Sequence, residues 1–182
     1  MMRILAISGS LRAASANSRL VEALGLVAPP GVEVAIYAGL GDLPHFNPDL
    51  DGDAPPAAVL ELRRQIGLCD GLVICSPEYA HGVAGTMKNA LDWLVASLEF
   101  AGTPVALINA SPFSEFAQPQ MRETLTVMSG EVVDAASLTI PLQGGKMTAA
   151  EVAADPEMSA RLRAALEALV DHARKALTSS RV

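Results

Sequence analysis

Two stretches of the sequence carry more hydrogen-bonding residues than a short connection between elements needs. The first, SGSLRAASANSRL at positions 8–20, combines several hydroxyls, an amide and the cation of Arg12 close to the expected start of a helix. The free backbone N–H groups at a helix N-terminus favour an anion. The alternative is a solvated turn in which a serine or asparagine caps the helix. The hydrogen-bonding side chains of this stretch are Ser8, Ser10, Ser15, Asn17 and Ser18, and with the cation of Arg12 they would suit a phosphate monoester.

The second stretch, SPEYAHGVAG at 76–85, follows the apolar run GLVIC and leads into a helical pattern. Pro77 removes a backbone donor and stiffens the exit from the expected strand. The N–H groups of residues 78–82 can then face the edge of a ligand, and Gly82 and Gly85 let a flat molecule approach the backbone closely. A planar heterocycle that has many acceptors and carries a phosphate would fit both stretches. Flavin mononucleotide (FMN) is such a molecule.

Several sharper motifs are absent from the sequence. It contains no G-x-x-x-x-G-K-[ST], no G-x-G-x-x-G after the first strand and no G-x-S-x-G. These absences argue against a P-loop nucleotide site, a Rossmann NAD site and a serine hydrolase, respectively. No metal site is expected, because the three histidines are scattered and the spacing of Cys69 and Cys75 matches no zinc pattern. The two cysteines are expected to be free, buried thiols.

Length and charge limit the class of protein further. The 182 residues suit a single domain, expected to span 1–182, and 51% of them are hydrophobic. The net charge of −7, without a basic run, argues against a nucleic-acid or anionic-membrane partner. No apolar run approaches the roughly 18 residues of a membrane span, and the apolar start is too short for a signal peptide. A cytoplasmic location is therefore expected.

Short β-rich runs alternate with helical periods along the whole chain, which predicts an α/β protein. The first helix is expected to follow Asn17 as its N-cap, and a later helix is expected to be closed by Gly130. Asp155 and Pro156 are expected to open the last helix. The expected strands are 3–8, 32–37, 71–76, 104–110 and 131–142, the last of which need not be continuous, and further helices are expected at 56–69 and 86–98.

Five successive βα units predict a five-stranded parallel sheet, in the order 2-1-3-4-5, with helices on both faces. Ligands of such sheets bind beyond the carboxyl ends of the strands, where the strand order reverses. The two unusual stretches leave strands 1 and 3, which are neighbours in this order. The sequence therefore predicts that both stretches border one ligand site.

The two stretches together carry a resemblance to a known family. GSLRAASANSRL followed by PEYAHGVAGTMKNALDW resembles the NAD(P)H-dependent FMN reductase family of flavodoxin-like fold, which includes quinone, chromate and azo-dye reductases. The resemblance extends from the first to the fourth strand and includes DLPHFNPD at 42–49. In two places the chain departs from the family pattern, because Ala80 stands where many members have Asn and Ala84 where many have Pro.

The resemblance implies a set of cofactor-binding residues. It places the FMN phosphate on the first loop, and it lays the isoalloxazine ring against the second. Ser111, after the fourth strand, falls where the family often places another flavin contact. The implied phosphate contacts are Ser10, Arg12, Ser15 and Asn17, and the implied ring contacts are Pro77, Glu78, Tyr79, Ala80 and Gly82.

The activity that the resemblance implies is hydride transfer from NADPH or NADH, through bound FMN, to a quinone, free flavin or a similar small acceptor. The cofactor carries this chemistry, so no catalytic side chain is expected, and structural roles are favoured for Glu78 and Tyr79. His81 is expected to be solvated or at an interface, and Trp93 to pack or lie at an interface.

Two other functions stay open. The chain would also suit a flavodoxin-type electron carrier or a regulatory flavoprotein, neither of which turns over NAD(P)H directly. The aromatic content of only 4% favours the reductase, because a carrier typically shields its flavin between aromatic rings. An open flavin face needs walls, so a homodimer or homotetramer is expected, with the Trp93 helix and the loop at 42–50 as contact surfaces.

Overall fold

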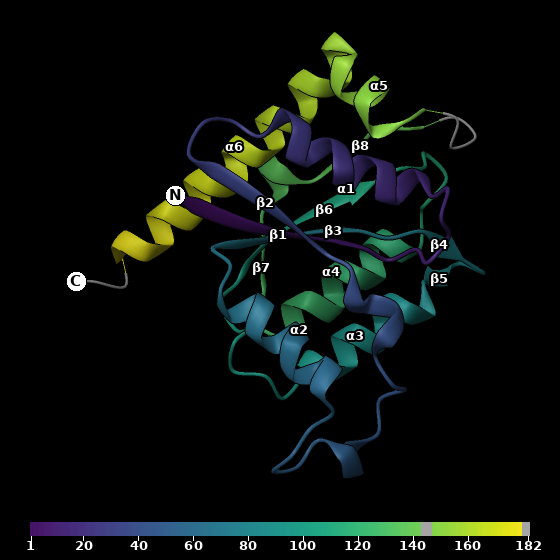
Figure 1. The fold of residues 1–182 in the computed structure, drawn as a ribbon, viewed down its shortest axis with the longest axis vertical. Coiled ribbons are helices and arrows are strands. Elements are labelled where there is room, and N and C mark those ends of the chain that lie inside the picture. Colours follow the sequence, from purple (N-terminus) through teal and green to yellow (C-terminus); the bar gives the residue numbers. More distant parts are fainter. Residues whose placement is uncertain (143–146, 180–182) are drawn as a thin grey trace.

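A parallel β-sheet forms the centre of the molecule in the computed structural model, which describes residues 1–142 and 147–179 (Figure 1). The strand order is β2-β1-β3-β6-β7, and β8 also pairs with β6 in parallel, so the predicted 2-1-3-4-5 order is confirmed. Every residue of β3 is buried, as expected for a strand that is covered on both faces. The strands are β1 (Met2–Ser8), β2 (Val32–Tyr37), β3 (Gly71–Cys75), β6 (Pro104–Asn109), β7 (Glu131–Val132) and β8 (Leu138–Thr139).

The fifth strand is interrupted, as the sequence allowed. A 3₁₀ turn at Asp134–Ala136 separates β7 from β8. Ser137 compensates for the broken ladder, because its Oγ accepts a hydrogen bond from Leu107 N at 3.0 Å and donates one to Val133 O at 2.9 Å. The side chain thus satisfies a backbone donor of β6 that the interrupted strand leaves without a ladder partner.

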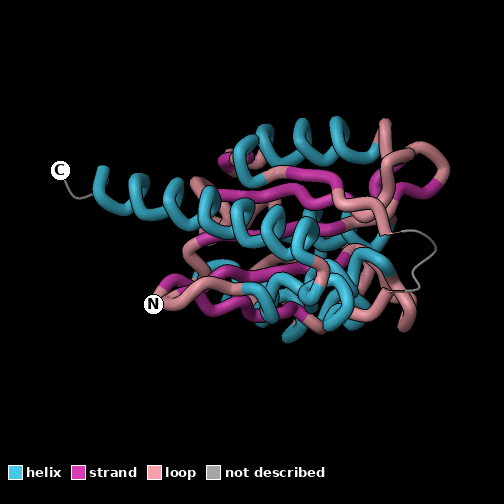
Figure 2. Tube along the Cα trace, turned by 90° about the horizontal axis from the view of Figure 1, so that it is seen from above, coloured by secondary structure: helices cyan, strands magenta, loops and turns pink. Residues whose placement is uncertain are grey.

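Helices cover both faces of the sheet, which confirms that prediction, and a separate apolar cluster fills the space on each side. Figure 2 shows the strands running side by side and α6 extending beyond them at its C-terminal end. Although α6 is 24 residues long, no helix in the described part of the chain has both the length and the apolar character to cross a membrane. One face carries α1 (Ala16–Val27), α5 (Ala149–Ala154) and α6 (Pro156–Ser179), and the other carries α2 (Ala57–Gly67), α3 (Gly85–Leu94) and α4 (Ala117–Val127).

Two helix ends differ from the prediction. Ser15, rather than Asn17, is the N-cap of α1, because its side chain accepts a hydrogen bond from Ser18 N and Asn17 lies in the first turn. At the end of α4 the left-handed residue is Ser129, with φ 63°, rather than Gly130. Gly130 is needed for a different reason, since a Cβ there would lie 2.9 Å from the ring of Phe100.

The ends of three other helices also bear on the predictions. The helix predicted at 86–98 ends at Leu94. Helix α5 was not predicted, although the sequence contains its start signal, because Thr148 and Glu151 form a reciprocal capping box. Asp155 caps α6 as expected, since its carboxylate accepts from Met158 N at 2.8 Å.

The segment that precedes α2 is fastened to α3. Trp93 is fully buried, donates from Nε1 to Pro44 O at 2.8 Å and packs edge-on against Phe46 with ring centroids 5.0 Å apart. Asn89 adds two hydrogen bonds to the same loop, one to Pro44 O and one from Phe46 N. Trp93 is therefore a packing residue whose contacts lie within the chain.

Candidate functional site

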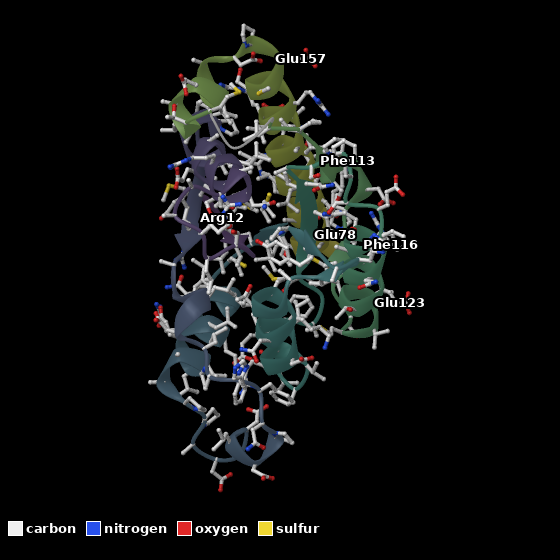
Figure 3. All side chains as sticks on the ribbon, turned by 90° about the vertical axis from the view of Figure 1, so that its right-hand side faces the viewer. Arg12, Glu78, Phe113, Phe116, Glu123 and Glu157 are labelled. Atoms are coloured by element: carbon white, nitrogen blue, oxygen red, sulfur yellow. The ribbon has the colours of Figure 1, made fainter. Side chains whose placement is uncertain are left out.

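A pocket of about 650 Å³ opens at the carboxyl ends of the central strands, where α/β sheets of this order bind ligands. Its volume falls within the range of typical small-molecule sites. Figure 3 looks onto this side of the molecule, with Arg12 on the side of the β1–α1 loop and Phe113 on the side of the β6 loop. The described residues that line it are Arg12, Ala14, Ala16, Asn17, Pro77, Glu78, Asn109, Ala110, Ser111, Pro112, Phe113, Ser114, Pro141 and Leu142.

The β1–α1 loop lies in direct contact with the loop that follows β3. Gly9 N donates to Cys75 O at 2.9 Å, and Thr86 Oγ1 donates to Gly9 O at 2.7 Å. A Cβ at Gly9 would lie 2.3 Å from Ser76 Oγ and 2.7 Å from Ser76 Cβ, closer than any real contact. Glycine at this position therefore allows the two loops to meet and to form one continuous wall.

The serine hydroxyls of the first loop also shape the loop itself. Arg12 N donates to Ser10 Oγ at 3.3 Å, and Ser10 N donates to Ser8 Oγ at 3.3 Å. Ser15 is buried and caps α1. Because a hydroxyl that accepts a hydrogen bond still has a proton to donate, Ser10 and Ser15 retain donors, although neither lines the pocket.

Arg12 and Asn17 are the predicted phosphate residues that the structure places at the pocket. Among the described residues, the Arg12 guanidinium has neither an ion-pair nor a hydrogen-bond partner. The Asn17 Oδ1 accepts from Cys75 Sγ at 3.2 Å, which leaves its NH₂ group to donate elsewhere. Burial raises the pKa of the Cys75 thiol, so it stays protonated and acts as the donor of this pair.

The N-terminus of α1 also favours an anion at this end of the pocket. The first turn of α1 contains no acidic residue, so the positive end of the helix dipole is uncompensated there. A free guanidinium, a free amide NH₂ and a helix N-terminus therefore meet at one end of the pocket. This donor set fits a phosphate monoester, and the plain alternative of a solvated capping turn does not explain why Arg12 lies at a pocket.

The second loop is a β-hairpin, which the sequence did not predict. Strands β4 (Glu78–Tyr79) and β5 (Gly82–Val83) pair antiparallel and are joined by Ala80 and His81, with φ 50° and 58°. Two-residue hairpins of this kind favour Asn-Gly, and a residue with a Cβ costs roughly 1–2 kcal/mol in the left-handed region. The Ala-His pair gives no turn signal, which explains why sequence reasoning missed the hairpin.

Contacts with α4 hold this hairpin in place. Glu78 Oε2 accepts hydrogen bonds from Phe116 N and Ala117 N, each at 2.8 Å, and so caps a helix whose own N-cap side chain makes no bond. The His81 ring stacks on Phe116 with centroids 4.1 Å apart. Gln120 Nε2 donates to His81 O at 3.0 Å. The hairpin thus uses its polar groups to fix its own position.

The hydrogen bond from Ala117 N–H, assisted by that from Phe116, lowers the pKa of Glu78 although partial desolvation opposes the shift. The Ser114 hydroxyl lies close enough to contribute to this lowering. Its Oγ is nevertheless buried without a partner at hydrogen-bonding geometry among the described residues. Glu78 is therefore an engaged carboxylate at neutral pH rather than a free proton donor.

The structure brings together only part of the predicted ring-binding set. Pro77 and Glu78 line the pocket together with Ser111, whereas Tyr79, Ala80 and Gly82 do not. Tyr79 is 55% exposed. Gly82 does not have a positive φ, and a Cβ there would make only ordinary contacts, the nearest with Tyr79 O at 3.6 Å.

The loop after β6 supplies a wall that sequence reasoning largely missed. Asn109 Nδ2 donates to Ser111 O at 2.5 Å, Ser111 N donates to Asn109 Oδ1, and Phe113 N donates to Ser111 Oγ at 3.2 Å. An Asn two residues before a Ser, directly after a strand, is a recognisable side-chain turn signal. No comparable signal marks Phe113, Pro141 or Leu142 as pocket residues. Within residues 1–142 and 147–179, no group of three His, Cys, Asp or Glu side chains is placed to hold a metal ion.

The sheet order, with a pocket across the carboxyl ends of its central strands, defines a flavodoxin-like α/β protein. Residues 2–145 match the family model of NADPH-dependent FMN reductases. The chain belongs to that family.

Curated relatives and solved structures agree with this assignment. An NAD(P)H-dependent FMN reductase of Pseudomonas aeruginosa is 40% identical over 133 residues, which cover 70% of this chain and 71% of the relative. A quinone reductase of Escherichia coli is 35% identical over 113 residues, 60% of each chain. The flavoenzyme NAD(P)H:(acceptor) oxidoreductase of Paracoccus denitrificans superposes with a TM-score of 0.74 at 26% identity, covering 96% of this chain and 98% of that structure.

Proposed function

We propose that this protein is an FMN-dependent reductase that oxidises NAD(P)H and delivers two electrons to quinones, free flavin or similar small acceptors. The net reaction converts NAD(P)H, a proton and a quinone into NAD(P)⁺ and a hydroquinone. The family of the chain and the activities named for its relatives support the proposal. The single observation of the structure that carries it is the Arg12 guanidinium beside the N-terminus of α1, which has no partner among the described residues and lies at one end of the pocket.

The described residues fit FMN in two parts. Arg12, the NH₂ group of Asn17 and the first N–H groups of α1 would hold the phosphate, with the hydroxyls of Ser10 and Ser15 close by. The isoalloxazine ring would lie across the pocket toward the β6 loop. Its proposed contacts are Pro77, Glu78 and Ser111, which line the pocket, and the backbone of Tyr79, Ala80 and Gly82, which follow Glu78 in the chain but do not line it.

When bound, FMN supplies both the hydride-accepting and the hydride-donating chemistry, so the protein needs no acid or base of its own. The Glu78 carboxylate is committed to α4, and no free acidic side chain lines the pocket within the described residues. The protein therefore binds and orients its ligands, and the proton for the hydroquinone comes from solvent. Because donor and acceptor would use the same pocket in turn, we expect ping-pong kinetics.

The absorption spectrum of the purified, FMN-loaded protein tests this proposal, recorded anaerobically before and after addition of NADPH. Loss of the flavin band within seconds and its return on addition of a quinone would support the reductase. A bound flavin that NADPH leaves oxidised, but a chemical reductant bleaches, would identify an electron carrier or a regulatory flavoprotein instead. A protein that takes up no FMN would refute the proposal.

We further propose that the protein is a homodimer or homotetramer in the cytoplasm. Phe46 and Leu50 leave apolar surface exposed on the loop fastened to α3, which supports a contact between copies there. Trp93 itself is excluded from such a contact, since it is fully buried within the chain. The free thiols Cys69 and Cys75 suit a reducing compartment. A fully active monomer in light scattering at micromolar concentration would overturn the oligomer.

A further inference from the structure

Phe113 is an unusual side chain for this protein. The chain has only four Phe, two Tyr and one Trp, of which Trp93, Phe100 and Tyr37 are buried and Phe46, Phe116 and Tyr79 are 37–55% exposed. Phe113 is instead 82% exposed, and it lines the rim of the pocket (Figure 3). A large ring left in water beside a pocket gains favourable burial only when something occupies that pocket.

The backbone that carries Phe113 is held firmly. Its N–H donates to Ser111 Oγ, and Ser111 is in turn fixed through its backbone by two hydrogen bonds with the buried Asn109. Asn109 is the last residue of β6, so this chain of hydrogen bonds connects Phe113 to the sheet. The backbone from which the ring projects is therefore held in place, which lowers the part of the entropy cost of ligand binding that would come from ordering this loop.

The surroundings of Phe113 favour an uncharged ligand. Among the described residues that line the pocket, only Arg12 and Glu78 carry charge. Arg12 lies on the opposite side, at the β1–α1 loop, and the Glu78 carboxylate is bonded to the start of α4 (Figure 3). The side of the pocket next to Phe113 is otherwise formed by uncharged residues, including Pro112, Pro141 and Leu142.

We propose that Phe113 determines acceptor specificity, by stacking on flat, uncharged aromatic acceptors of the naphthoquinone type when they enter the FMN-loaded pocket. The inference rests on the proposed reductase function and adds a substrate class and a residue to it. Two aromatic rings packed in an offset or edge-on arrangement gain about 0.5–1.5 kcal/mol beyond the burial of their apolar area. An inorganic acceptor such as ferricyanide, which is highly charged and not flat, would gain nothing from Phe113.

Three variants distinguish a contact that needs an aromatic ring from one that needs only an apolar side chain. Phe113→Ala removes the ring, Phe113→Leu keeps apolar volume without a ring, and Phe113→Tyr keeps the ring. The matched control is Leu98→Ala. Leu98 is 90% exposed in the segment that leads into the amino end of β6, whereas the pocket lies at the carboxyl ends of the strands. All four variants change exposed residues, and thermal melts establish that each variant is folded.

The first measurement avoids turnover. Calorimetric titration of oxidised, FMN-loaded protein with 1,4-naphthoquinone, without NADPH, gives the dissociation constant of the acceptor alone. We expect Phe113→Ala to raise it by about tenfold and Phe113→Leu by about threefold to fivefold, whereas Phe113→Tyr and Leu98→Ala stay near the wild type. Equal constants for the wild type and Phe113→Ala would overturn the inference.

The second measurement is the ratio of kcat/KM for naphthoquinone to kcat/KM for ferricyanide, with NADPH as donor. Phe113→Ala should lower this ratio by about tenfold, and Phe113→Tyr should restore it. A ratio that does not change would overturn the inference while leaving the reductase function intact. A wild-type protein that oxidises no NADPH would refute the reductase function first.

The third measurement is the affinity for FMN, from quenching of flavin fluorescence. We expect Phe113→Ala to change it by less than about twofold, because the ring would contact the acceptor rather than the cofactor. If FMN affinity falls as much as naphthoquinone affinity does, Phe113 is a wall of the flavin site and not a selector of acceptors.

Discussion

The β1–α1 loop and the β4–β5 hairpin border the same pocket but use their polar groups in opposite ways. The first loop leaves the Arg12 guanidinium and the Asn17 NH₂ group without partners among the described residues. The hairpin bonds Glu78 and the His81 carbonyl to α4 and keeps two residues in a costly backbone conformation. The first loop thus keeps polar groups available for a ligand, whereas the hairpin uses its polar groups to hold its own backbone conformation.

The largest effect should come from the cation of the first loop. Arg12→Ala should weaken FMN binding by roughly 1.5–3 kcal/mol, or about 10- to 150-fold, because a charge-assisted hydrogen bond to the phosphate is lost. Riboflavin, which lacks the phosphate, serves as the control ligand and should bind both proteins alike. Fluorescence titrations measure both affinities. Equal losses for the two ligands would show that Arg12 does not mark the phosphate end.

The junction between the two loops is the next most sensitive point. Gly9→Ala should lower the free energy of unfolding by about 1–3 kcal/mol, since its Cβ would overlap Ser76. The matched control is Gly25→Ala in α1, where nothing lies within 4 Å of the added Cβ and a gain of about 0.5–1 kcal/mol is expected. Urea unfolding compares the two. Similar changes in both variants would mean that the loops do not touch as described.

The hairpin should respond to pH through Glu78. Its folded pKa is lowered from 4.5, so the carboxylate contributes stability above about pH 4.5, and this contribution is lost as pH falls through the folded pKa. The stability difference between the wild type and Glu78→Gln should therefore be largest near pH 7 and shrink as the pH falls below 4.5 and through the folded pKa. Urea unfolding at several pH values checks this. Glu115→Gln is the control, and a difference for Glu78→Gln that is constant with pH would exclude the capping carboxylate.

The smallest expected effect is a gain at the turn of the hairpin. Ala80→Asn should raise the free energy of unfolding by about 0.5–1 kcal/mol, because Asn tolerates the left-handed region better than Ala. For a chain of this size the melting temperature should rise by about 1–4 °C. Ala164→Asn, at an exposed position inside α6, should give no gain. A hairpin whose stability is unchanged by Ala80→Asn would not be strained.

Much of the fold was predictable because its signals are local. The alternation of apolar runs and helical periods predicted a parallel sheet with helices on both faces. Helix α5 carried a readable start signal, the Thr148 and Glu151 capping box. The hairpin carried none, because Ala80 and His81 adopt their conformation only through contacts with α4.

The candidate site was predictable to a lesser degree. Residue types in the β1–α1 loop indicated a phosphate, and Arg12 and Asn17 do lie at the pocket. The sequence could not indicate that Glu78 would cap a distant helix or that Phe113 would stay exposed, since both depend on how the β6 loop folds back. Residues whose side-chain chemistry alone suggests a role could be predicted from the sequence. Residues whose role depends on their tertiary contacts could not.

The hydrogen bond between Cys75 and Asn17 makes the proposed phosphate end of the pocket observable without any flavin signal. Cys75 is completely buried and its thiol stays protonated, so a thiol reagent can react with it only when the surrounding structure opens. The rate at which the reagent labels Cys75 therefore measures how often this region opens. A bound ligand that keeps the region closed would lower this rate, so mass spectrometry of the labelled protein would report binding even for colourless compounds.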